Sequence, residues 1–265
     1  MPKKILTIAG SDSISGGGIQ ADLATFSEYG VFGFTAITSI VTILDDQFFI
    51  HETELSILRE QLETIFAQKD IAAIKIGLLP NIPIIQLVSE FLAKNQDKYI
   101  VCDPVLVFKE TKNVSTVHFA QELIDAIFPY ADIITPNLDE ARVLADMQFI
   151  HTLEDMHLAA RNIVRKGAKS VIIKGGSRLH GEHACDYYFD GIVRQTFETQ
   201  KLLVNTNNGS GCTFSSAIAS NLANGLSMIE AIKDAKDFVY QGIKYGLPID
   251  DSLGNVWQAA RRMKS

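Results

Sequence analysis

Short apolar runs alternate with longer amphipathic segments along most of the chain. Runs rich in β-branched residues predict buried strands, and apolar side chains at every third or fourth position predict helices. The predicted strands are Lys4–Ala9, Thr35–Ile43, Ala72–Ile76, Tyr99–Val101, Asp132–Thr135 and Ser170–Ile173. The predicted helices are Ile19–Tyr29, Glu54–Ala67, Pro83–Lys94, Gln121–Phe128, Leu153–Lys166, Thr213–Asn224 and Met228–Tyr245. A small hairpin is predicted over Cys185–Arg194, turning at Asp190 and Gly191.

Strands that alternate with helices predict an α/β protein whose mostly parallel sheet is covered on both faces. No linker rich in proline, serine or glycine, no charge block and no internal repeat divides the sequence. We therefore expect one domain over residues 1–265. Because ligands bind at the carboxyl ends of the strands in such sheets, the loops after the strands are where chemistry is expected.

Composition narrows the class of function. Hydrophobic residues make up 47% of the chain and charged residues 21%, which are ordinary values for a folded protein. The net charge of −7 disfavours a general nucleic-acid binder but leaves room for a local nucleotide site. Cys102, Cys185 and Cys212 are far apart, and the apolar stretch Val31–Leu44 is too short to span a membrane. With no visible signal peptide, these features predict a cytoplasmic protein without a membrane or nucleic-acid partner.

A glycine-rich loop directly before a predicted helix carries the strongest chemical signal. Gly209, Ser210 and Gly211 let a ligand approach the backbone closely, and the first helical turn offers amide groups and a positive dipole end. Such a loop favours an anion hole for a phosphoryl group in transfer. Cys212 stands at the helix start, where a thiol pKa of about 8.5 can fall toward 7. A glycine-rich N-cap with a small buried cysteine is the alternative that spacing alone leaves open.

Several other polar residues follow predicted strands. Asp12 lies in a glycine-rich segment without the spacing of a dinucleotide-binding loop, and it could instead cap the next helix. Asn137 and Glu140 have the spacing of a capping box, in which Glu140 reaches back to the Asn137 backbone. Asp103 also follows a predicted strand, and Lys174, taken alone, is a solvated turn residue.

Taken together, these segments resemble one known family. Gly-Ser-Gly-Cys-Thr-Phe-Ser-Ser-Ala, which starts at Gly209, resembles the signature of the hydroxymethylpyrimidine and phosphomethylpyrimidine kinases and of the Gram-positive-type pyridoxal kinases. Both groups belong to the ribokinase-like superfamily. Similar segments run in the expected order from residue 5 to about residue 225. Two departures are Asn208, where many relatives have histidine, and Leu78, where they have methionine.

The resemblance implies a three-layer α/β/α fold with a minimal lid, a homodimer, and a kinase that uses ATP and Mg²⁺, with K⁺ as a further candidate ion. It implies that Cys212 is the general base and that Gly209, Ser210 and Gly211 form the anion hole. The implied substrate contacts are Gly10, Asp12, Leu78 and Val105. The implied contacts to ATP are Lys174, Asn137 and Glu140, with Glu140 and Asp103 at the metal.

Two substrates compete within this resemblance, both small heterocyclic alcohols or aldehydes. Thr38–Ile43 followed by Asp45-Asp46-Gln47, together with Tyr187–Gly191, resembles the pyridoxal kinase branch, and the Ala-Gln-Asn-Thr of the pyrimidine kinases is absent. We therefore expect phosphorylation of pyridoxal or pyridoxine, with hydroxymethylpyrimidine as the alternative or an additional substrate. A non-catalytic binding protein is a third interpretation. The joint presence of Lys174, Glu140 and Cys212 weighs against it, because a binder needs no phosphate-handling groups.

Overall fold

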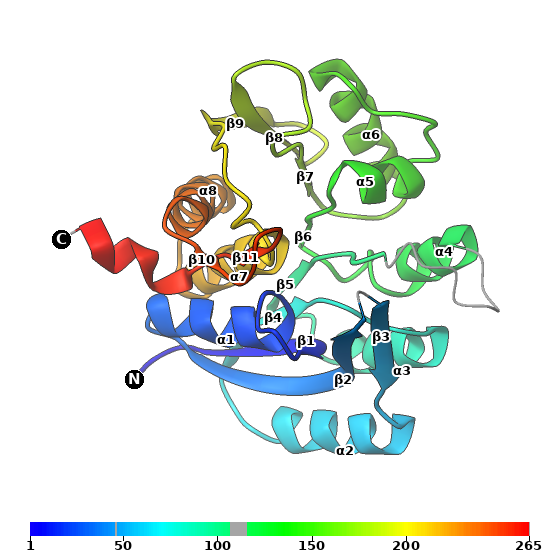
Figure 1. Cartoon of the computed structure of the whole chain (residues 1–265). Helices are drawn as coiled ribbons and strands as arrows, with labels where there is room; N and C mark the ends of the chain where they lie inside the picture. Colours follow the sequence, from blue (N-terminus) through cyan, green and yellow to red (C-terminus); the bar gives the residue numbers. More distant parts are fainter. Residues whose placement is uncertain (46, 107–115, 265) are drawn as a thin grey trace. The chain divides into compact units, whose positions relative to one another are not determined.

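The computed structural model describes residues 1–45, 47–106 and 116–264 (Figure 1). Its main strands are β1 (Lys4–Asp12), β2 (Phe32–Leu44), β3 (Gln47–Glu52), β4 (Ile71–Ile76), β5 (Tyr99–Cys102), β6 (Ile133–Ile134), β7 (Val171–Lys174), β8 (His183–Phe189) and β9 (Arg194–Gln200). Its helices are α1 (Gly18–Glu28), α2 (Leu55–Phe66), α3 (Ile82–Ala93), α4 (Thr116–Ala126), α5 (Leu138–Leu144), α6 (Leu153–Arg165), α7 (Ser210–Ala223) and α8 (Met228–Lys244). The short strands β10 (Leu247–Pro248) and β11 (Gly254–Asn255) precede a 3₁₀ helix, η1 (Gln258–Lys264).

The described residues form a nine-stranded, mostly parallel sheet in the order β3-β2-β1-β4-β5-β6-β7-β8-β9. Parallel pairing joins β1 to β2 and β4, and β6 to β7, whereas β3, β8 and β9 run antiparallel to their neighbours. Apolar side chains in β1 and β7 are fully buried, as expected for strands covered on both faces. The predicted α/β class is therefore confirmed.

The chain divides into two compact units. The first unit comprises Met1–Pro80, Asp97–Val101 and Leu202–Ser265, and the second comprises Asn81–Gln96 and Cys102–Lys201. In the first unit, α7 packs against α1, α8 and β4, and α2 covers β2 on the side opposite α1 (Figure 1). In the second unit, α6 packs on β7 and β8 and contacts α5, while α3 packs on α4.

Most predicted elements are present, with ends displaced by a few residues. The clearest omission is β3, which pairs antiparallel with β2 from Leu44↔Gln47 to Ser39↔Glu52. Its side chains are exposed or only half-buried, so this short edge strand lacks a buried apolar run. The predicted hairpin is confirmed as β8 and β9, although the strands extend to His183 and Gln200. Asp46, in the acidic segment noted above, lies outside the described residues.

No helix among the described residues is both long enough and apolar enough to cross a membrane.

Candidate active site

The first turn of α7 forms the centre of the site in the first unit. Gly209 is the N-cap of α7 with a φ of 81°, and a methyl group at this position would collide with the carbonyl oxygen of Gly16. Only glycine fits both constraints. Cys212 is half-buried in the first turn, where the geometry of a helix leaves the first amides without an acceptor inside it. One of them, the Ser210 amide, donates to the Asn207 carbonyl oxygen at 3.1 Å. The arrangement can therefore stabilise negative charge beside a thiol.

The amino terminus of a second helix reaches the same thiol. A methyl group placed on Gly17, the N-cap of α1, would lie 3.6 Å from Cys212 Sγ and 3.8 Å from Asp12 Oδ2. The positive ends of α1 and α7 therefore meet at Cys212, and helix amino termini favour a negatively charged group. The alternative of a fully buried, inert cysteine does not match this half-buried position.

Asp12 organises the loop that brings α1 to the thiol. Its Oδ1 accepts from Ile14 N at 3.1 Å, and its Oδ2 accepts from Gly17 N at 2.8 Å. The backbone N–H of Asp12 donates to Gln20 Oε1 at 2.9 Å. The alternative that Asp12 caps the helix is wrong, because Gly17 is the N-cap and no side chain caps it.

Asn208, the departure from the family's histidine, also fastens this loop. Its Nδ2 donates to Asn255 Oδ1 at 2.8 Å, and Asn255 Nδ2 donates to the Ile14 carbonyl oxygen at 2.8 Å. A methyl group on Gly16 would collide with the Asn208 amide, so the loop lies directly against this side chain. The asparagine pair therefore holds the loop after β1 against the loop before α7.

Gly10 and Leu78, two predicted substrate contacts, lie close together at the ends of β1 and β4. A methyl group on Gly10 would lie 2.8 Å from Ser39 Oγ and 3.3 Å from Leu78 Cδ2. Thr38 Oγ1 donates to the Leu78 carbonyl oxygen at 2.7 Å. Pairing of β1 with β2 shifts register at this point, between Ala9 and Ser11. Such irregularities re-aim side chains and are common beside active sites.

Ser39, beside Gly10, is a buried polar residue whose hydroxyl has no hydrogen-bond partner among the described residues. Its hydroxyl is the one buried side-chain polar atom without a hydrogen-bond partner in the part of the chain that the structure describes. The side chain is 0% exposed. An unsatisfied buried hydroxyl is unfavourable, so this position carries a local energetic penalty.

The second unit gathers the other predicted residues at the ends of three strands. Asp103 follows β5, and its Oδ1 accepts from Lys174 Nζ, at the end of β7, at 2.7 Å and from Thr135 Oγ1 at 3.1 Å. Val105 is half-buried, and its backbone N–H donates to the Asp103 carbonyl oxygen at 2.8 Å. Lys174 is therefore a partly buried ion-pair partner and not the solvated turn residue of the alternative interpretation.

Asn137 and Glu140 form a capping box at the start of α5. Asn137 Oδ1 accepts from the backbone N–H groups of Asp139 and Glu140, and Glu140 Oε2 accepts from Asn137 N at 2.7 Å. Burial raises the pKa of Glu140 to about 7; the Lys174 charge opposes this rise and the Asp103 carboxylate adds to it. The capping box and a role at a metal are compatible, because the cap uses one carboxylate oxygen.

The donor set of the second unit fits Mg²⁺. The Asp103 carboxylate lies close enough to Glu140 to raise the pKa of that residue, and Mg²⁺ prefers such oxygen ligands. No cluster of three or more histidine, cysteine or acidic side chains suited to a metal occurs among the described residues. A site with two carboxylates still suits Mg²⁺, which keeps several of its waters.

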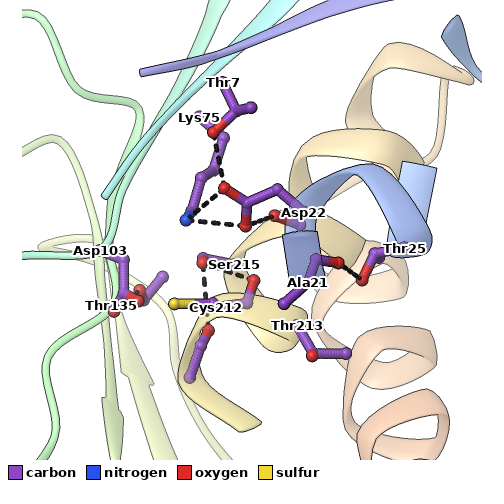
Figure 2. Close-up of polar contacts among 12 residues, drawn as sticks. Thr7, Ala21, Asp22, Thr25, Lys75, Asp103, Thr135, Cys212, Thr213 and Ser215 are labelled. Carbon is purple, nitrogen blue, oxygen red and sulfur yellow. Dashed lines mark hydrogen bonds and ion pairs between the residues drawn. The ribbon is translucent and has the colours of Figure 1, made fainter. Parts of the chain in front are cut away.

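Two functional candidates in the first unit have no role assigned by sequence reasoning. Asp22 and Lys75 form a completely buried ion pair at 2.8 Å (Figure 2). One signal for this pair is present in the sequence, because Lys75 lies within the otherwise apolar strand β4. A charge buried in such a strand needs a partner of opposite charge. The sequence does not show which acidic residue that partner is.

The structure thus assembles the predicted residues in two groups. The first unit brings together Gly10, Asp12, Leu78, Gly209, Ser210, Gly211 and Cys212. The second unit brings together Asp103, Val105, Asn137, Glu140 and Lys174.

Comparisons with known proteins show the family of the chain. The protein-family model for phosphomethylpyrimidine kinase matches residues 12–257. The pyridoxine kinase of Bacillus subtilis is 40% identical over 263 residues, which cover 98% of this chain and 97% of that protein. The hydroxymethylpyrimidine/phosphomethylpyrimidine kinase of Haemophilus influenzae is 38% identical over 265 residues, covering 98% of both chains.

A solved structure shows the same similarity. The pyridoxal kinase from Staphylococcus aureus, in complex with AMP-PCP and pyridoxal, matches with a TM-score of 0.92 and 38% identity, covering 98% of this chain and 95% of that chain. The family match extends over nearly the whole sequence and includes every candidate residue of the two groups except Gly10. The chain belongs to the phosphomethylpyrimidine kinase family.

Proposed function

We propose that this protein transfers the γ-phosphoryl group of ATP to the hydroxymethyl group of pyridoxal or pyridoxine. The observation that carries the proposal is the Cys212 thiol in the first turn of α7, beside the N-cap of α1. The similarity to the pyridoxine kinase and to the pyridoxal kinase bound to AMP-PCP, an ATP analogue, supports the substrate pair.

In the proposed reaction, Cys212 as thiolate accepts the proton of the substrate hydroxyl. The hydroxyl oxygen forms a bond to the γ-phosphorus, and the bond from that phosphorus to the bridging oxygen breaks, so that ADP leaves. The amides at Gly209, Ser210 and Gly211 stabilise the negative charge on the phosphoryl oxygens. Because such transition states are loose, positioning and charge stabilisation contribute more than proton removal.

The ring is proposed to lie against Gly10, Asp12 and Leu78 in the first unit, and Val105 in the second unit is the fourth proposed substrate contact. The narrow spacing around Gly10 leaves no room for a larger residue, and Leu78 supplies an apolar wall. Asp12 is proposed to contact polar substituents of the ring. Alternatively, its hydrogen bonds to the Ile14 and Gly17 amides fix the backbone around those substituents.

The second unit is proposed to handle the nucleotide. Lys174 contacts the phosphates, and Asn137, Glu140 and Asp103 hold Mg²⁺, partly through water. When bound, Mg²⁺ neutralises phosphate charge that would otherwise oppose attack by the hydroxyl oxygen. Lys174 also balances the two carboxylates electrostatically, as its opposing effect on the pKa of Glu140 indicates.

Hydroxymethylpyrimidine is the second candidate substrate. The Haemophilus kinase for that pyrimidine is nearly as similar as the B. subtilis pyridoxine kinase, and both alignments span the chain. The ring sizes are alike and both substrates carry a hydroxymethyl group, so activity on both is part of the proposal. We also propose that the protein is a cytoplasmic homodimer of single kinase domains. K⁺ is proposed as an additional ion.

Mass spectrometry of the reaction mixture tests the proposal. Wild-type protein incubated with MgATP and pyridoxal should convert the ring to a product heavier by one phosphoryl group, and Cys212→Ala should do so far more slowly. If pyridoxal, pyridoxine and hydroxymethylpyrimidine all remain unmodified, the proposed function is wrong.

A further inference from the structure

A closed polar network lies beneath the thiol in the first unit, and the mechanism above does not use it. Both carboxylate oxygens of Asp22 on α1 accept from Lys75 Nζ on β4, at 2.8 Å and 2.9 Å (Figure 2). Thr7 Oγ1 on β1 donates to Asp22 Oδ2 at 2.6 Å, and Ser216 Oγ on α7 donates to Asp22 Oδ1 at 2.6 Å. All four side chains are 0% exposed.

The network joins every element that carries a predicted site residue in this unit. Ser216 follows Cys212 by four residues, so both side chains lie on the same face of α7. Thr7 precedes Gly10 by three residues on β1, and Lys75 on β4 precedes Leu78, which lies beyond the end of that strand, by three residues. Asp22 is therefore bonded one helical turn from the thiol and about 10 Å along β1 from Gly10.

Two contacts set the alignment of α1 with α7. Gly17 lies beside Cys212, and one turn farther along both helices Asp22 is bonded to Ser216. The helices therefore run in the same direction here, with both amino termini at the thiol. The Asp22–Ser216 hydrogen bond keeps the two positive helix ends together. Without it, the packing of α1 against α7 and the loop contacts around Gly16 and Asn208 would remain to hold them.

We propose that Ser216 and Asp22, with Lys75 and Thr7, are positioning residues that hold the Cys212 thiol at the paired amino termini of α1 and α7. Ser216 acts through Asp22 and touches no reacting atom. The inference rests on the proposed function, because it assigns the network to the same phosphoryl transfer.

The chain contains matched controls for this network. Ser216→Ala removes the bond to Asp22, whereas Ser220→Ala removes a hydroxyl on the same helix that donates only to the Ser216 carbonyl oxygen at 2.8 Å. Thr7→Val removes the second hydroxyl, and its control is Thr25→Val, whose hydroxyl donates to the Ala21 carbonyl oxygen at 2.7 Å (Figure 2). All four positions are fully buried, so each pair removes the same group from a similar environment.

Steady-state kinetics with MgATP and pyridoxal gives the first measurement. Ser216→Ala should lower kcat by roughly tenfold or more, because small displacements of a reacting group are strongly penalised. Its KM for ATP should stay within about twofold of wild type, since no nucleotide contact changes. Ser220→Ala and Thr25→Val should retain wild-type kcat, Thr7→Val should lower it, and Ser216→Thr, which restores the hydroxyl, should recover activity.

A second measurement does not depend on turnover. The rate of Cys212 alkylation by iodoacetamide would be measured across pH by mass spectrometry of the peptide that contains this residue. The pH at which the rate rises should be higher in Ser216→Ala than in wild type and unchanged in Ser220→Ala. Asp12 lies beside the same Gly17 position as the thiol, Asp22 and Lys75 belong to the network, and none of these charged groups is altered in the two variants. Thermal unfolding of each variant confirms that it is folded.

The inference is overturned if Ser216→Ala matches Ser220→Ala in both kcat and the alkylation profile. If the wild type phosphorylates none of the rings, the proposed function fails, and an unshifted alkylation profile in Ser216→Ala would then overturn the positioning role as well. A shifted profile with an inactive wild type would support the positioning role for a different reaction.

Discussion

Cys212 combines a modest degree of exposure with a position between two helix amino termini. Neither feature alone identifies a general base, because small half-buried cysteines are common. Gly209 leaves space only for backbone at the N-cap of α7, and Gly17 brings the N-cap of α1 beside the same sulfur atom. Two helix amino termini therefore concentrate positive potential there. The proposed mechanism therefore depends on whether the Cys212 sulfur acts as the general base.

Replacing Cys212 tests that role directly. We expect Cys212→Ala to lower kcat for pyridoxal by about 10²-fold or more, the usual contribution of a positioned general base. The affinity for ATP should change little, because the proposed nucleotide contacts lie in other residues. The half-buried Cys185→Ala is the control and should behave as wild type. Wild-type turnover by Cys212→Ala would remove the thiol from the mechanism.

Ser39 permits a prediction about stability. Its buried hydroxyl has no partner, so Ser39→Ala should raise the free energy of unfolding by about 1 kcal/mol, measured by denaturant titration. Thr38→Val is the contrasting change, because Thr38 Oγ1 donates to the Leu78 carbonyl oxygen and its loss should destabilise. A destabilised Ser39→Ala protein would show that the hydroxyl has a partner in solution.

At the scale of elements, the loops on either side of α1 and α7 were only partly predictable. The helix after Gly209 is predicted from local sequence to begin at Thr213 and begins at Ser210. The strands that end beside Asp103 and at Lys174 also follow from local sequence, because apolar runs have local causes. The Asn208–Asn255 pair spans 47 residues, and the Asp22–Ser216 bond spans 194. No periodicity encodes such partners, so tertiary structure is needed to find them.

Dependence on a partner strand also explains why the sequence does not predict β3. This edge strand is stabilised by its pairing with β2 more than by an apolar pattern of its own. The interpretation of Asp12 as a helix cap was wrong because the chain continues through a tight turn to Gly17 before α1 begins. Turn geometry over several residues decides which residue caps, and composition does not specify it.

Gly209 provides a test at this scale. Gly209→Ala must place a methyl group against the Gly16 carbonyl oxygen at a φ of 81°, so we expect kcat to fall sharply and stability to drop by about 1–3 kcal/mol. Gly225, after the other end of α7, also has a positive φ of 94° but no atom within 4 Å of the added methyl group. Gly225→Ala should lose about 1 kcal/mol and keep its kcat. Equal activity losses in the two variants, measured kinetically, would contradict the special fit of Gly209.

For the molecule as a whole, the carboxyl-terminal η1 is attached to the first unit through Asp234 on α8. Tyr29 Oη and Asn221 Nδ2 donate to Asp234 Oδ2 at 2.5 Å and 2.8 Å, and Arg261 donates to Oδ1 at 2.9 Å. The Arg261 guanidinium also lies over the Phe238 ring at 4.8 Å. Burial alone would raise the pKa of Asp234, but these hydrogen bonds and the Arg261 charge outweigh it and lower the pKa.

This lowered pKa predicts how stability depends on pH. The contribution of ionised Asp234 is complete above its unfolded pKa, near 3.9, and is lost as the pH falls through the lower folded value. At pH 7, Asp234→Asn should be less stable than wild type by roughly 1 kcal/mol, a small value because the carboxylate is 34% exposed and screened. The difference should shrink below about pH 4. Denaturant titrations from pH 3 to pH 7 would measure this difference, with a substitution of an exposed residue, Asp237→Asn, as control. A difference in free energy of unfolding between wild type and Asp234→Asn that stayed constant over this range would contradict the role of ionised Asp234.

The central claim is that the chain is a kinase for vitamin B6 rings, and a substrate comparison tests it most directly. ADP release would be measured with MgATP and with pyridoxal, pyridoxine and hydroxymethylpyrimidine, each over a full concentration range, to obtain three kcat/KM values. A kinase for vitamin B6 rings should show a higher kcat/KM for pyridoxal or pyridoxine than for the pyrimidine. A clear preference for hydroxymethylpyrimidine, or no ADP release with any ring, would contradict it.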